Sequence, residues 1–183
     1  MDVTKREDNA AAVAATVEAF GSINVAVFNA GLNKPRFFMD IDEDNWDLIM
    51  NVNTKAMWLG MQETAKQMIA QGKRDYPYKL INVGSIASRK PLVDVTVYCT
   101  SKYGCLALTH CGAVALAEHN ITSNADCTLK ENIEFSPLIA FAEDVLIGRP
   151  VTPQPVLALP ETRVFQQPNQ CLTHKHPACR VAC

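Results

Sequence analysis

Tyr98 and Lys102 are the pair of residues in this sequence that are best placed to do chemistry together. They lie four positions apart at the start of a predicted helix, so their side chains share one helix face and reach each other. A free phenol titrates near ~10, and an ammonium within ~4–6 Å can lower that pKa by roughly 1–3 units. Tyr98 is therefore predicted to carry a proton, with Lys102 as the group that makes this possible.

Ser85 lies thirteen residues before Tyr98, just past the end of a predicted strand. Its hydroxyl could hydrogen-bond a substrate oxygen and hold it against the phenol while charge develops there. Protein side chains cannot supply a hydride, which a nicotinamide cofactor normally provides. The three residues together therefore favour a proton transfer that is coupled to hydride transfer, with a nicotinamide cofactor, NAD or NADP, as the hydride carrier.

The elements that must position these residues alternate between helix-like and strand-like segments. The β-rich runs cover residues 23–28, 79–83 and, more weakly, 123–127. The predicted helices cover residues 10–20, 46–69 and 98–119. Thr4 is expected to cap the first helix and Gly21 to end it. Such spacing predicts an α/β fold: a partial doubly wound, Rossmann-like parallel sheet with helices on both faces.

Two clusters could suggest a metal site, and neither is predicted to be one. The acidic residues Asp40, Asp42, Glu43, Asp44 and Asp47 surround the start of the second helix, where the helix dipole favours negative charge and Asp42 or Asp44 can cap. The late residues Cys171, His174, His176, Cys179 and Cys183 are compact, but their spacing fits no common zinc finger.

Composition divides the chain near residue 130. Six of the ten prolines lie after residue 149, so residues 131–183 are predicted to form a divergent, proline-rich and poorly ordered tail. Residues 1–130 are predicted to form an incomplete Rossmann-like catalytic domain.

Charge and cysteine content limit the partners and the compartment. The net charge of −2 gives no basic surplus, so nucleic acid is not an expected partner. No apolar run is long enough to suggest a signal or a membrane span. An odd count of seven cysteines argues against a disulfide-stapled secreted scaffold, so a cytoplasmic protein with reduced thiols is expected.

Six segments of this sequence match motifs of one family, and they occur in the same order along the chain as in that family. Tyr98-Cys99-Thr100-Ser101-Lys102 is similar to Y-x-A-S-K, Asn82-Val83-Gly84-Ser85 to N-x-S-S, and Asn29-Ala30-Gly31 to the end of N-N-A-G. Asp2-Val3-Thr4 is similar to D-V-T, Trp46-Asp47 with Asn51-Val52-Asn53 to a long-helix segment that carries an active-site Asn, and residues 121–127 to a strand before a Pro-Gly turn. Together they resemble the classical short-chain dehydrogenases/reductases.

The resemblance implies a role for each matching residue. Tyr98 would exchange the proton, Ser85 would orient the carbonyl or hydroxyl group, and Asn53 would hold a relay water. Lys102 would lower the tyrosine pKa and contact the nicotinamide ribose. The cofactor-binding residues would be Asp2, at the adenine, with Asn29, Ala30, Gly31, Tyr98 and Lys102. A small-molecule alcohol or carbonyl substrate and a homo-oligomer are expected.

The sequence departs from the family at the segment that grips the cofactor diphosphate. Its eight glycines contain no G-x-G, so the T-G-x-x-x-G-x-G turn is missing. Losing two or three backbone donors would weaken cofactor binding by ~10³-fold or more. The family's first strand would pair beside residues 23–28, which are therefore expected to present an unpaired apolar edge. A catalytically inactive remnant that acts as an association module, through this edge and two long helices, is the alternative interpretation.

Overall fold

The computed structural model describes residues 1–127. The predicted tail over residues 131–183, with its Cys and His cluster, lies outside the described residues. No helix in the described range is both long and apolar enough to cross a membrane.

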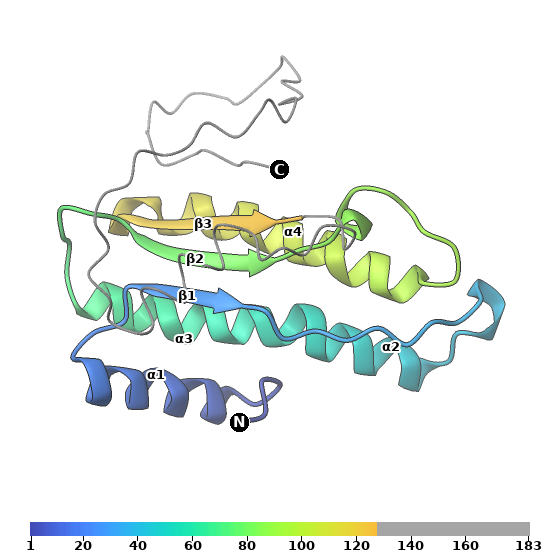
Figure 1. Ribbon diagram of the computed structural model, residues 1–183, viewed down its shortest axis with the longest axis horizontal. Coiled ribbons are helices and arrows are strands. Elements are labelled where there is room, and N and C mark those ends of the chain that lie inside the picture. The colour runs from blue at the N-terminus through green and yellow to red at the C-terminus, as the bar shows by residue number, and fades with distance from the viewer. Residues whose placement is uncertain (128–183) are drawn as a thin grey trace, which may run out of the picture.

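Three strands form a parallel sheet in the order β1-β2-β3 (Figure 1). They are β1 (Val25–Phe28), β2 (Tyr78–Val83) and β3 (Ile121–Asp126). Phe28 pairs with Asn82 and Val83 pairs with Asp126, so the three strands end along one edge of the sheet. The predicted α/β parallel sheet is confirmed, including its weak third strand.

Within residues 1–127, four α-helices accompany the strands. They are α1 (Arg6–Phe20), α2 (Glu43–Met50), α3 (Ala56–Ala70) and α4 (Thr96–Leu116). A π-helical turn, η2 (Asn51–Lys55), joins α2 to α3, so the long helix predicted over residues 46–69 is confirmed with one irregular turn. Short 3₁₀ turns complete the described chain: η1 (Phe38–Asp40), η3 (Ile86–Ser88) and η4 (Ala117–His119).

The helix boundaries follow local capping rules, with one correction. Gly21 ends α1 with a φ of 77°, as predicted, because the left-handed region suits glycine. Asp42 caps α2 and accepts a hydrogen bond from the Asn45 amide at 2.7 Å. The predicted Thr4 cap is wrong, because the Thr4 hydroxyl instead donates to the Asp2 carboxylate at 2.7 Å and α1 begins after Lys5.

The core lies on one face of the sheet. Alternate strand residues, such as Leu80 and Ile121, pack against α3 and α4 through Met61, Met68 and Cys105. α1 covers the same face beside α3 (Figure 1). The expected helices on both faces are therefore not met within residues 1–127, where the long helices share one face. The reason is topological: right-handed crossovers between strands added in one direction place successive helices on the same side.

Candidate active site

Asn53 occupies the π-helical turn and is buried, with 1% of its surface exposed. Its Oδ1 accepts from the Leu32 amide at 2.8 Å, and its Nδ2 donates to the Leu32 carbonyl at 2.9 Å. The same Nδ2 donates to Ser101 Oγ at 2.9 Å. π-Turns insert one residue into a helix and recur at functional sites. Here the turn carries a side chain that joins the loop after β1 to helix α4.

Lys102 is the buried cation of the site, with 5% of its surface exposed. Its Nζ donates to the Val83 carbonyl at 2.8 Å, so a residue of α4 is tied to the end of β2. Burial lowers the pKa of Lys102 from its ordinary value of 10.5, because a charged ammonium is poorly solvated there. A buried ammonium acts on its neighbours more strongly than an exposed one, since less water screens it.

Tyr98 and Lys102 come together as their spacing predicts. Lys102 Nζ lies 5.7 Å from the centroid of the half-buried Tyr98 ring. This separation is inside the ~6 Å at which an ammonium and an aromatic ring attract each other. The first turns of α4 therefore present a phenol and an ammonium at the carboxyl end of the sheet.

Ser85 follows β2 and starts the turn η3, which packs against α4. Its Oγ accepts from the Ala87 amide at 3.1 Å, and its own amide donates to Ser88 Oγ at 3.2 Å. This reciprocal capping fixes the Ser85 backbone. Among residues 1–127 the structure gives the Ser85 hydroxyl proton no acceptor, so that proton can be donated to a substrate oxygen.

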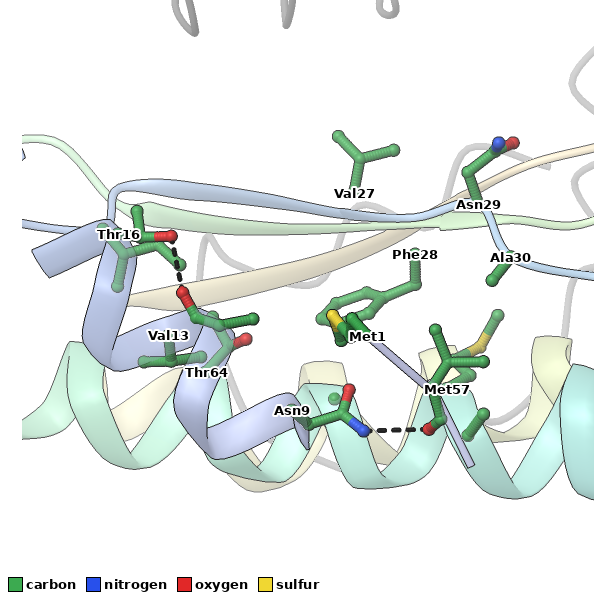
Figure 2. Close-up of a pocket in the computed structure, with 15 residues that line it drawn as sticks. Met1, Asn9, Val13, Thr16, Val27, Phe28, Asn29, Ala30, Met57 and Thr64 are labelled. Atoms are coloured by element: carbon green, nitrogen blue, oxygen red, sulfur yellow. Dashed lines mark hydrogen bonds between the residues drawn. The ribbon is translucent and has the colours of Figure 1, made fainter. Parts of the chain in front are cut away.

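The predicted cofactor residues lie in two adjoining places. Asn29 and Ala30 line a cavity of about 290 Å³ between β1, α1 and α3 (Figure 2). Gly31 lies at the other place, because a Cβ added there would stand 3.3 Å from Asn53 Oδ1 and 3.7 Å from Lys102 Nζ. The segment after β1 thus runs from the cavity to the buried ammonium.

Asp2 is exposed, and Thr4 hydrogen-bonds its carboxylate from both side chain and backbone, which lowers the pKa of Asp2. Its neighbours Met1 and Val3 line the cavity, whereas Asp2 itself does not. A contact between Asp2 and an adenine stays a prediction.

Two residues of this region had no role in the sequence interpretation. Ser101 is fully buried, and its Oγ donates to the Tyr98 carbonyl at 2.7 Å. Asn9 is buried on α1 and donates to the carbonyls of Val3 and Lys5 at 2.8 and 2.7 Å, which fixes the N-terminal segment beside the cavity (Figure 2). Ser101 stands in the segment matched to Y-x-A-S-K, whereas a polar residue at an apolar helix position is the sequence signal for Asn9.

The arrangement fits one end of a nicotinamide dinucleotide. Gly31 leaves space that a Cβ would fill beside Lys102, and Tyr98 and Lys102 offer a hydroxyl and an ammonium there. No G-x-G turn for the diphosphate occurs in the sequence. Within residues 1–127, no group of three or more His, Cys, Asp or Glu side chains is arranged to hold a metal ion.

The described chain has a parallel α/β sheet, with Ser85 directly after β2 and with Asn53, Tyr98 and Lys102 on the helices beside it. The chain belongs to the short chain dehydrogenase family, whose model matches residues 1–129.

Two relatives of this chain are named as a gluconate-derivative dehydrogenase and a galactitol dehydrogenase. The chain is 36% identical over 124 residues to 2-dehydro-3-deoxy-D-gluconate 5-dehydrogenase of Escherichia coli (strain K12), covering 68% of this chain and 48% of the relative. It is 33% identical over 125 residues to galactitol 2-dehydrogenase of Agrobacterium fabrum (strain C58 / ATCC 33970), covering 68% and 48%.

A solved structure of the same family resembles this chain in fold. The gluconate 5-dehydrogenase of Burkholderia cenocepacia J2315, in complex with NADP and tartrate, is 26% identical with a TM-score of 0.63 and is covered over 48% of its length by 68% of this chain. The chain thus spans about half the length of the relatives it matches.

Proposed function

We propose that this chain carries the proton-transfer half of an NAD- or NADP-dependent oxidoreductase that interconverts an alcohol and a ketone or aldehyde. One observation carries the proposal: Lys102, buried and tied to the Val83 carbonyl, holds its ammonium 5.7 Å from the Tyr98 ring centroid. The family and the names of the relatives support the same reaction class.

Each residue has one task in the proposed reaction. In the reducing direction Tyr98 gives its hydroxyl proton to the substrate carbonyl oxygen, while Ser85 donates a hydrogen bond to that oxygen. Lys102 stabilises the phenolate left on Tyr98, and in the oxidising direction this phenolate takes the alcohol proton back. When bound, NAD or NADP supplies or accepts the hydride.

The substrate is proposed to be a small polyhydroxylated alcohol or its carbonyl form. This follows from the names of the relatives, which act on a gluconate derivative and on galactitol. Tyr98, Lys102 and Gly31 would hold the nicotinamide ribose, and Asn29 and Ala30 would line the adenosine side. A homo-oligomer in the cytoplasm stays a prediction, as does the choice between NAD and NADP.

The test compares Tyr98→Phe with Tyr103→Phe. Tyr103 lies on the same helix with 45% of its surface exposed, so it is a matched control for loss of a hydroxyl. D-gluconate and galactitol are the probes, each with NAD and NADP, and nicotinamide absorbance is the readout. We expect Tyr98→Phe to lower kcat by about 10²-fold or more, since that is the usual contribution of a positioned acid or base. A kcat in Tyr98→Phe that equals the wild-type kcat would refute the assigned role of Tyr98.

One observation favours the alternative function, association with a second copy through the edge of β1. Within residues 1–127, β1 pairs with β2 on one side only. Val27 and Phe28 point to opposite sides of β1, yet both line the same cavity (Figure 2). The cavity therefore extends along the free edge of the strand, and exposed strand edges invite pairing.

Size-exclusion chromatography and thermal melting separate the two functions. The association module predicts dimers or larger species and no rise in Tm with NAD or NADP. The oxidoreductase predicts a rise in Tm with at least one of them, because a ligand that binds only the folded state stabilises it. A stable monomer that melts higher with cofactor would count against the association module.

A further inference from the structure

Ser101 is the junction between the asparagine and the tyrosine of the site. Its side chain is fully buried, and its Oγ lies 2.9 Å from Asn53 Nδ2 and 2.7 Å from the Tyr98 carbonyl oxygen. An amide nitrogen of Asn only donates and a carbonyl oxygen only accepts. The Ser101 hydroxyl therefore accepts from Asn53 and donates to Tyr98, so both of its bonds have a fixed direction.

The Asn53 amide is fixed with equal strictness. The Leu32 N–H can only donate, so Oδ1 must face it, and the Leu32 carbonyl can only accept, so Nδ2 must face that. With one bond to Ser101, both hydrogens of Nδ2 are used. The amide cannot flip without breaking all three bonds.

A second contact places the same two segments against each other. Thr54 Oγ1 donates to the Ser101 carbonyl at 3.0 Å, and Cys105 Sγ donates to the Asn53 carbonyl at 3.2 Å. The backbones of η2 and α4 are therefore packed closely around Ser101. Of the side chains in these contacts, the Ser101 hydroxyl is the one that also bonds Tyr98, by donating to its carbonyl.

The geometry points to Ser101 as a positioning residue, which sets Tyr98 against the Asn29–Leu32 segment through Asn53. This inference rests on the proposed function for its effect on turnover, but the link itself is structural. Lys102 anchors α4 to β2 through Val83, and Ser101 anchors the same turn to the loop after β1. Together the two anchors hold the first turns of α4, which carry Tyr98, against the end of β2 and the loop after β1.

The experiment uses the full chain with Ser101→Ala, Ser101→Cys and the control Thr100→Ala. Thr100 is the adjacent residue and its Oγ1 also bonds a helix carbonyl, that of Thr96 at 3.0 Å, but it is exposed. Ser101→Cys keeps the shape of the side chain, with a larger sulfur atom and a much weaker hydrogen bond, so it serves if Ser101→Ala does not fold.

Hydrogen–deuterium exchange at the Leu32 amide reports the link without any turnover. We expect the Ser101 variants to raise this exchange rate by about 10-fold, because Asn53 loses one of the three bonds that fix it, whereas Thr100→Ala leaves it unchanged. An unchanged Leu32 exchange rate in the Ser101 variants would overturn the inference.

Turnover with D-gluconate or galactitol gives the second readout. We expect kcat to fall by about 10-fold while KM changes by less than about 2-fold, because misplacing a catalytic group costs rate rather than binding. A higher KM with an unchanged kcat in the Ser101 variants would also overturn the inference. If the wild-type chain shows no turnover, the proposed function fails, and Leu32 exchange still decides whether the link exists.

Discussion

The two sides of α3 are built in different ways. On the α4 side, Asn53, Ser101 and Lys102 are buried and each is held by directed hydrogen bonds. On the α1 side, β1 borders a cavity of about 290 Å³, and Arg6 bridges α1 to Glu63 of α3. The difference teaches that, within residues 1–127, the proposed proton-transfer residues are held by directed hydrogen bonds, whereas the edge of β1 that faces away from β2 borders open space.

The largest effect on stability should come from Asn53→Ala. This variant leaves the half-buried Leu32 N–H and C=O without their side-chain partner, and an unsatisfied group that water does not reach costs about 1–3 kcal/mol. We expect a loss of about 2–4 kcal/mol in the free energy of unfolding, measured with urea. Asn51→Ala is the control, since Asn51 lies in the same turn and is exposed. Equal losses in the two variants would show that the Asn53 bonds contribute nothing.

Two glycine substitutions compare the packing of the two sides directly. A Cβ at Gly60 would lie 2.7 Å from Phe28 Cε1, and a Cβ at Gly104 would lie 3.0 Å from Thr54 Cγ2. Overpacking typically costs about 1–3 kcal/mol, and replacing a helical glycine by alanine returns about 1 kcal/mol.

The shorter distance at Gly60 suggests that Gly60→Ala is the more destabilising of the two variants. We expect the opposite, because the neighbour of Gly60 has space to move. Phe28 borders the cavity and its ring can move, whereas Thr54 is held by the Ser101 carbonyl at 3.0 Å. We expect Gly104→Ala to lower the free energy of unfolding by about 1–2 kcal/mol and Gly60→Ala to change it by less than about 0.5 kcal/mol. A greater loss in Gly60→Ala would mean that the α1 side is as tightly packed as the α4 side.

The burial of Lys102 predicts a pH dependence of stability. Burial lowers its pKa in the folded chain below the ordinary 10.5, so between those two values the unfolded chain binds more protons. The free energy of unfolding of the wild type should therefore rise, relative to that of Lys102→Met, as the pH increases through the lowered pKa towards 10.5. Urea denaturation of both proteins at several pH values measures the difference. A difference that is constant with pH would contradict the burial of a charged Lys102.

A small effect is also expected for Glu63→Gln on the α1 side. Hydrogen bonds from Lys66 and, more weakly, from Arg6 lower the pKa of Glu63, but the side chains of both partners are largely exposed, at 66% and 41%. Such pairs contribute less than about 1 kcal/mol at neutral pH. Because the pKa is lowered, this stability is lost as the pH falls through it, so variant and wild type should converge in acid. Glu18→Gln, at an exposed site on α1, is the control in urea denaturation.

Much of the fold was predictable from local pattern, and parts of the site were not. The run at residues 79–83 and the helix that carries Tyr98 and Lys102 were expected and are confirmed within a few residues. The Thr4 cap was wrong because α1 begins at Arg6, so Lys5 takes the N-cap position and Thr4 lies one residue before it. The π-turn at Asn53 could not be predicted, since an extra residue in a helix is stabilised by partners on other elements.

The sequence by itself determined the order of strands and helices and the shared face of Tyr98 and Lys102, because hydrophobic period and helical spacing are local properties. Only the tertiary structure decided that Lys102 binds the carbonyl of Val83, nineteen residues away, and that Asn53 meets Ser101, forty-eight residues away. A buried polar group takes the partner that packing brings within about 3 Å, and that partner depends on how the helices seat on the sheet.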